Sequence, residues 1–344
     1  MGMLTLDEVL AHQKDMAHLC ADRPLTTREI FAPNAFYGFD AIFKEYAGLP
    51  QTYALKAILP HGVLFNEKQI WEAEKNVRLP AIFCYPPYKD AYQTQTNKKV
   101  ILSAAPFLYV KKMAASQPQP PRRGTIVFPH HSTHLLRAQF NSEQLIETLL
   151  QFGDEYQPIT VCIYWQDFLL NRHLPYQQRG MQIVSAGHIY DPDFLYRLYH
   201  LCSLHRYAVG HSFGSHLFHA VAAGCSYSHL DYIDYVSTPL NQIHPEDQAI
   251  EIASEKADRL KALFHQRRPT MTSEQIAVVN DYLGQKYFQT PQNLYRQIVY
   301  TEIIDKLGCF TYQHGKISGL RYPTWLRRNI AQIIRKFHMK KDTK

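Results

Sequence analysis

Long apolar runs and paired cysteines are both missing from this chain of 344 residues. No stretch of about 18 consecutive apolar residues occurs, so we expect no transmembrane helix. The N-terminus has no long apolar segment either, and we therefore expect no signal peptide. The six cysteines are scattered without a CxxC pair, a pattern typical of free thiols in a reducing compartment. These absences predict a cytoplasmic protein.

Several fingerprints of cofactor and metal sites are absent as well. The chain has neither a GxGxxG dinucleotide-binding motif nor a Walker A loop. It also lacks HExxH, and no carboxylate lies near His130, His131 and His134, which cluster in sequence. We therefore expect no bound metal and no cofactor, with a zinc site at these histidines as the minor alternative.

Positive charge, which gives a formal net charge of +7, is concentrated at the C-terminal end. Apolar residues such as Trp325, Ile330 and Phe337 repeat there at helical spacing, so residues 323–344 predict a basic amphipathic helix. Such a helix suits an anionic membrane surface, which would place the protein on the inner face of the plasma membrane. Packing of the helix onto the protein core is the equal alternative. Nucleic acid is not an expected partner, because the basic residues are not interleaved with a recognised motif.

Short apolar stretches alternate with helical or loop segments through most of the chain. The first half predicts an amphipathic helix at 4–19 and three buried strands. One lies in the segment 53–65 and stops at Pro60-His61-Gly62, and the others lie at 79–85 and 99–104. The second half predicts strands at 125–128, 159–164, 182–185 and 207–209, with helices at 142–152 and 191–204 and a further helix ending at Ala223. Residues 245–306 are predicted to be mainly helical.

This alternation is typical of parallel α/β domains. A proline-rich connector at 116–124 separates the two halves. The predicted fold is α/β, with Rossmann-like domains at 1–115 and 125–244, a linker at 116–124 and a helical C-terminal region at 245–344.

Two segments at predicted strand ends carry the candidate chemistry. Each of GTIVFPHHSTHL, at 124–135, and YAVGHSFGSHLFHAVAAGC, at 207–225, runs from an apolar strand through hydroxyl residues and histidines toward a helix. Open α/β sheets bind phosphorylated ligands at such positions, because N–H groups at a helix start carry partial positive charge. Ala186-Gly187-His188 has the same form. The candidate nucleotide-binding residues are His131, Ser132, Thr133, Gly187, His188, His211, Ser212, Gly214, Ser215 and His216.

The structural alternative for these residues is a set of polar loops and ordinary helix caps. A separate candidate is His61, which follows a buried strand beside Gly62. The ordinary pKa of histidine, near 6.5, suits a general base for a hydroxyl group at neutral pH. A loop histidine that caps a turn is the alternative there.

A rival interpretation comes from Gly210-His-Ser-Phe-Gly214, which matches the GxSxG motif of serine hydrolases between a strand and a helix. Ser212 would then be the nucleophile, with His244 and Asp231 or Asp234 as partners. The two-half layout with a proline linker favours the nucleotide-binding interpretation.

Four motifs over roughly residues 50–225 resemble bacterial GT-B glycosyltransferases of surface-polysaccharide synthesis: LPHG at 59–62, FPHHSTH at 128–134, SAGHIYDPDFLYRL at 185–198 and HSFGSHLFHAVAAG at 211–224. The similar groups are polysialyltransferases, Kdo-transferases and enzymes like CDP-glycerol glycerophosphotransferase. The resemblance implies that His61 is the catalytic base. It also implies that His131, Ser132, Thr133, His188, Ser212 and Ser215 bind the donor's phosphates.

The resemblance further implies a donor linked to CMP, CDP or UDP and a glycan or lipid-linked glycan acceptor, in capsule or lipopolysaccharide synthesis. No E-x7-E pair lies within these four motifs, which favours inversion, and no convincing DxD motif suggests a metal-dependent GT-A enzyme. After Gly224 the chain departs from the pattern, because the usual proline-led strand is missing. A non-catalytic carbohydrate-binding module of the same fold is the third interpretation.

Overall fold

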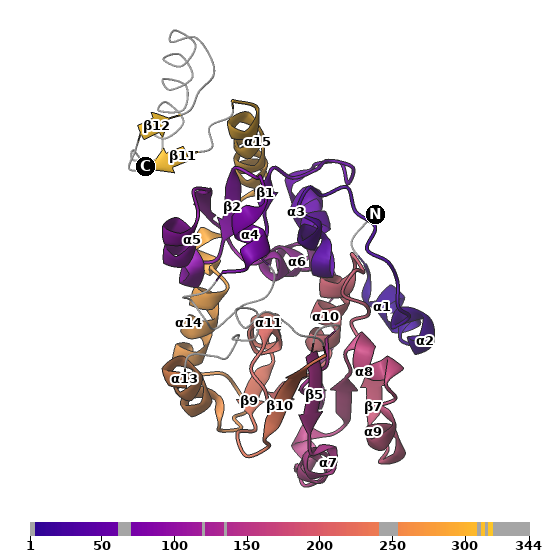
Figure 1. The fold of residues 1–344 in the computed structure, drawn as a ribbon. Helices are drawn as coiled ribbons and strands as arrows, with labels where there is room; N and C mark the ends of the chain where they lie inside the picture. Colours follow the sequence, from indigo (N-terminus) through magenta and orange to yellow (C-terminus); the bar gives the residue numbers. More distant parts are fainter. Residues whose placement is uncertain are drawn as a thin grey trace.

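The computed structural model describes residues 4–60, 70–118, 121–133, 136–240, 254–307, 311–313 and 316–318. Its strands form two parallel sheets, one from each half of the chain, with helices packed around them (Figure 1). The predicted α/β fold with two parallel sheets is therefore confirmed.

The first sheet has the order β1-β2-β3 and is parallel throughout. Its strands are β1 (Ala57–Ile58), β2 (Ala81–Cys84) and β3 (Lys99–Leu102). The elements around it are η1 (Ala32–Gly38), α3 (Phe39–Ala47), α4 (Glu72–Asn76), η2 (Pro86–Tyr88), α5 (Lys89–Gln95) and α6 (Pro106–Ala114). Every residue of β2 is buried, as expected for a parallel strand covered on both faces.

The second sheet has the order β7-β6-β4-β8-β9 and is also parallel. Its strands are β4 (Thr125–Phe128), β6 (Ile159–Cys162), β7 (Gln182–Val184), β8 (Tyr207–Gly210) and β9 (Ser226–His229). The chain starts at the central β4, moves outward to β7, and then crosses to β8 on the other side of β4. The direction of strand order thus reverses between β4 and β8, where open α/β sheets place their ligand crevice.

The elements that connect these strands agree with the predicted alternation. They are α7 (Ser142–Leu150), η3 (Asp154–Tyr156), α8 (Trp165–Leu169), α9 (Leu174–Gln178), α10 (Phe194–Ser203) and α11 (Ser215–Ala223). The sequence did not predict β9, nor the antiparallel pair of β5 (Leu136–Phe140) and β10 (Tyr235–Pro239). Four of the five residues of β10 are exposed, so its pattern lacks the apolar signal of a buried strand.

The N-terminal segment is not the single helix that was predicted for 4–19. It forms α1 (Leu6–His12) and α2 (Met16–Leu19), because Asp15 starts a new helix by accepting a hydrogen bond from the His18 N–H at 3.0 Å. This segment packs on the second sheet's helices. Gln13 Nε2 donates to the Ser185 carbonyl at 3.0 Å, and Arg23 pairs with Asp191 at 3.2 Å.

The C-terminal helices run back from the second sheet to the first. They are α13 (Ser254–Phe264), α14 (Ser273–Tyr282) and α15 (Pro291–Leu307), with η4 (Gln285–Tyr287) between the last two and the pair β11 (Thr311–Gln313) and β12 (Lys316–Ser318) after them. Helix α14 packs on α11, whereas α15 lies beside α3 (Figure 1). The helical prediction for 245–306 agrees with the described residues 254–307.

The predicted tail helix from Pro323 and the candidate base His61 lie outside the described residues. Within the described residues, no helix is long and apolar enough to cross a membrane.

Candidate functional site

The two motif loops meet at the point where strand order reverses. Strands β4 and β8 are paired neighbours, so the loop that begins at Pro129 and the loop that begins at His211 leave the same edge of the sheet. The N–H of His130 donates to His211 Nε2 at 3.0 Å and joins the loops directly. The structure therefore brings the loop that carries His131 beside the His211–His216 segment, and we call this junction of the two loops the crevice.

Helix α11 begins in this crevice without a side-chain cap. Its N-cap, Gly214, is fully extended at φ −174° and has no side chain to cap the first turn. Ser215 and His216 are only half-buried, so solvent reaches the start of the helix. Uncapped N–H groups with partial positive charge form an anion-binding position.

The imidazoles around the crevice are uncharged at neutral pH. Burial is the main cause that lowers the pKa of His130 to about 3 and that of His211 to about 4. Burial also lowers the pKa of His131, although Asp167 opposes this shift, and that of His216. These side chains can therefore donate or accept hydrogen bonds, and the positive potential of the crevice comes from the helix start.

The glycines of the GHSFG segment make room for His216. A methyl group on Gly210 would lie 2.6 Å from His216 Nε2 and 2.6 Å from the Tyr227 hydroxyl. A methyl group on Gly214 would lie 2.9 Å from His216 Nδ1. The His216 ring itself stacks on Phe128, with ring centroids 5.2 Å apart. Packing of this imidazole thus accounts for both glycines without a nucleophile between them.

Ser212 does not have the geometry of a hydrolase nucleophile. It is 2% exposed, and in the described part of the chain its hydroxyl makes no hydrogen bond to an imidazole. The strained turn of a nucleophile elbow is also missing, since the non-glycine residues with positive φ among those described are Tyr37 and Asn171. Asp231 and Asp234 are exposed, and His244 lies outside the described residues.

We expect Gly210→Ala to destabilise the protein by about 1–3 kcal/mol, because the added methyl group has no space beside His216. Introducing His216→Ala into that variant should recover part of the loss. Urea unfolding of the two single variants and the double variant measures the coupling. Strictly additive effects would show that the glycine is not required by the imidazole.

Ser132 and Thr133 shape their loop from the inside. Ser132 is fully buried; its N–H donates to Asp167 Oδ2 at 2.8 Å, and its Oγ accepts from the Ala138 N–H at 3.1 Å. Thr133 Oγ1 accepts from the Leu136 N–H at 3.1 Å. Both side chains hold the turn into β5, and the loop they shape presents His130 and His131.

Gly187 and His188 lie apart from the other candidates, at the end of the edge strand β7. Gly187 adopts a positive φ of 97° and lies against Arg197, whose Nη2 would be 2.9 Å from an added methyl group. His188 is 1% exposed, packs on Trp165 at 4.0 Å, and places Nε2 3.4 Å from Asp22 Oδ1. The N-terminal segment therefore covers this strand end.

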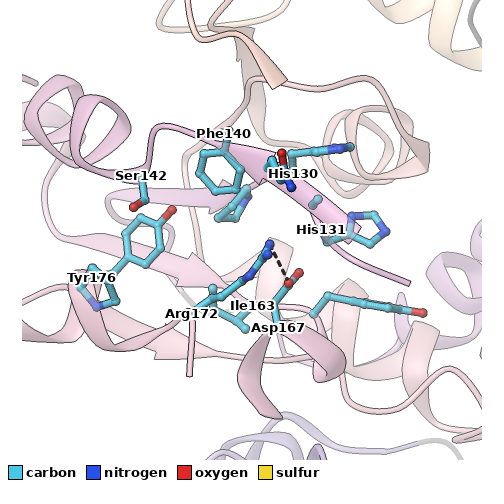
Figure 2. Close-up of a pocket in the computed structure, with 13 residues that line it drawn as sticks. His130, His131, Phe140, Ser142, Ile163, Asp167, Arg172 and Tyr176 are labelled. Carbon is cyan, nitrogen blue, oxygen red and sulfur yellow. Dashed lines mark ion pairs between the residues drawn. The ribbon is translucent and has the colours of Figure 1, made fainter. Parts of the chain in front are cut away.

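A pocket of about 310 Å³ lies beside the crevice, between the loop after β4, strand β5 and the α8–α9 segment (Figure 2). Arg172 points into it and contacts Asp167 Oδ1 at 3.3 Å. The lining residues are Pro129, His130, His131, Ala138, Gln139, Phe140, Ser142, Ile163, Tyr164, Asp167, Arg172, Pro175 and Tyr176. Among the described residues, no group of three His, Cys, Asp or Glu side chains is placed to hold a metal ion.

Sequence reasoning missed Asp167, Arg172 and Tyr176. They follow β6, whose carboxyl end lies at the same edge as that of β4. The other loops were identified because they follow the carboxyl ends of parallel strands, and the loop after β6 has the same position. It was overlooked because the segment contains no cluster of glycine or serine residues.

Comparisons with known proteins do not assign this chain to a family. No family model matches the chain, and no curated protein matches it either. Among solved structures, the pneumococcal O-GlcNAc transferase GtfA in complex with UDP and GlcNAc aligns at 15% identity and a TM-score of 0.35. The alignment covers 76% of this chain and 54% of that protein, so the chain spans about half of its length. A likeness this remote carries no inference about activity.

Proposed function

We propose that the protein is a metal-independent, inverting glycosyltransferase that uses a nucleotide-activated sugar. The observation that supports this best is the pairing of the two motif loops at the reversal of strand order, where the uncapped start of α11 faces the crevice. Parallel sheets bind nucleotide phosphates at this position. The first parallel sheet would supply the acceptor side.

In the proposed reaction, His61 removes a proton from the acceptor hydroxyl, and that oxygen attacks the anomeric carbon of the donor in line. The bond to the nucleotide phosphate breaks on the opposite face, so the anomeric configuration inverts. Negative charge that develops on the leaving phosphate is stabilised by the N–H groups at the start of α11 and by hydrogen bonds from nearby imidazoles. These imidazoles are uncharged before binding, and a bound phosphate favours their protonation.

The experiment that tests the proposal is incubation with CMP-, CDP- and UDP-linked sugars in the presence of EDTA, with release of the nucleotide as the readout. Turnover of one donor with a glycan acceptor supports transfer. Covalent labelling of Ser212 by a fluorophosphonate, without turnover of any donor, would support the hydrolase alternative. Binding of a glycan without turnover would support a carbohydrate-binding module.

We expect Ser215→Ala to weaken binding of the donor's nucleotide by about 1.5–3 kcal/mol, because a hydroxyl at the start of α11 donates to a charged phosphate. Calorimetry with the nucleotide that is released in the panel measures the change. Ser273→Ala, which removes an exposed hydroxyl from the start of α14, is the matched control. Equal affinity of wild type and Ser215→Ala would place the phosphate elsewhere.

We also propose a lipid-linked acceptor in surface polysaccharide or lipopolysaccharide synthesis, and attachment to anionic membranes through residues 323–344. Each Lys or Arg near such a surface contributes on the order of 1 kcal/mol. Vesicle flotation should recover the full chain, but not a chain that ends before Pro323, on anionic lipid at low salt. Failure of the full chain to float would assign these residues a structural role.

A further inference from the structure

Two residues that line the pocket each have a buried polar atom without a hydrogen-bond partner among the described residues. Tyr176 is 1% exposed, and its hydroxyl makes no hydrogen bond within the described residues. Asp167 is 4% exposed; its Oδ1 lies near Arg172 but makes no well-aligned hydrogen bond to any described residue. Buried polar groups in folded proteins are almost always paired. A ligand that supplies both a donor and an acceptor would satisfy these atoms.

The charges in the pocket nearly cancel. Arg172 is the cation and Asp167 the anion, and burial keeps the imidazoles of His130 and His131 uncharged at neutral pH. A phosphate or carboxylate favours a site with net positive charge. The pocket therefore suits an uncharged group, and the anionic part of a ligand has its place at the start of α11.

The walls of the pocket are flat and partly aromatic. Figure 2 shows the rings of Phe140 and Tyr176 on one side of the space that Arg172 enters, and His130 on another. His131 packs on Tyr164 at 4.6 Å and closes the side toward α8. Such walls favour a planar ring. The volume of about 310 Å³ is at the lower end for small-molecule sites, which fits a nucleoside better than a whole nucleotide sugar.

We propose that this pocket holds the pyrimidine nucleoside of the sugar donor, an inference that rests on the proposed function. Arg172 donates to a ring carbonyl or ring nitrogen, and Asp167 Oδ1 accepts from the adjacent N–H. Cytosine and uracil both carry such a donor–acceptor pair on one edge. The Tyr176 hydroxyl bonds a further polar atom of the nucleoside. His130 lines the pocket and also bonds His211, so the phosphates would pass His130 to reach α11.

Binding of cytidine, uridine and inorganic pyrophosphate to the full chain tests this assignment, with saturation-transfer NMR to detect ring protons in contact with the protein. We expect Arg172→Gln to lower nucleoside affinity about 10-fold and Tyr176→Phe about 3–10-fold, with pyrophosphate affinity unchanged. Matched controls are Arg179→Gln, whose arginine pairs with Glu143, and Tyr196→Phe, whose hydroxyl donates to Glu45. Thermal melting verifies that each variant is folded.

The assignment is overturned if wild type binds neither nucleoside, or if both pocket variants bind nucleosides as wild type does. A selective loss of pyrophosphate affinity, or displacement of the nucleoside by free monosaccharide, overturns it as well. Donor turnover by wild type together with unchanged nucleoside affinity in the variants would refute the pocket and leave the proposed function intact. Loss of nucleoside affinity in the variants, without turnover of any donor by wild type, would refute the function and leave the pocket intact.

Discussion

Replacing His61 with alanine is expected to lower the rate of sugar transfer by about 10²–10⁴-fold while nucleotide affinity stays unchanged. Strand β1 ends at Ile58, and the carbonyl of Pro60 accepts a hydrogen bond from the Tyr85 hydroxyl at 3.0 Å. The chain is thus anchored at the carboxyl end of the first sheet immediately before His61. This end of a parallel sheet is where catalytic side chains are commonly placed.

Steady-state transfer and nucleotide calorimetry on the same preparations separate catalysis from binding. The control is His265→Ala, which removes an exposed imidazole at the end of α13. A base role also predicts that the wild-type rate falls at acidic pH and that this dependence is lost in the variant. Near-wild-type turnover of His61→Ala would assign the base to another residue.

Acidification is expected to unfold the protein well before its carboxylates are titrated. Burial lowers the pKa of His211 and His229 to about 4 and that of His219 to about 3, below the ordinary value of 6.5. The unfolded chain therefore binds protons that the folded chain excludes, so stability is complete above about pH 6.5 and falls below it. Below pH 6.5, protonation of each of these histidines in the unfolded chain lowers the free energy of unfolding by about 1.4 kcal/mol per pH unit. The three together therefore lower it by about 4 kcal/mol at pH 5.5.

Urea unfolding at pH 7.5, 6.5 and 5.5 and constant ionic strength measures this loss. His219→Leu is the informative variant, because His219 stacks on Phe107 at 4.3 Å in the core and lies outside the candidate site. The variant should lose about 1.4 kcal/mol less than wild type between pH 7.5 and 5.5. A free energy of unfolding that stays flat down to pH 5 would contradict the buried, uncharged state of these histidines.

The elements that the sequence predicted well are those with continuous apolar strands. Residues 125–128 and 159–161 are buried and β-branched or aromatic, and both segments belong to strands of the second sheet. Strand β9, with the sequence Ser-Tyr-Ser-His, was missed because it contains a single large apolar residue, although all four of its residues are buried. Tertiary packing can stabilise polar residues in a buried strand, and the local sequence pattern carries no sign of that packing.

The candidate site was predicted in part for a similar reason. Position at a strand end is visible in sequence, so the loops at His131 and His211 were found. The direction of a side chain is not visible: Ser132 points inward to the Ala138 N–H, and His188 is covered by the N-terminal segment. Arg172 belongs to the pocket because the α8–α9 segment lies beside β5 and the loop after β4, which come more than 30 residues earlier in the sequence.

The C-terminal helices pack on the first sheet, so the first half of the chain can complete its packing only after these helices have been translated. The Ala105 N–H donates to the Leu283 carbonyl at 2.9 Å, Tyr109 stacks on Phe288, and Lys56 pairs with Asp305 at 3.8 Å. At roughly 5–20 residues per second, about 10–40 s separate translation of β3 from that of α15. The first half of the chain is therefore synthesised long before the helices that complete its packing, and exposed apolar surface during such an interval favours aggregation.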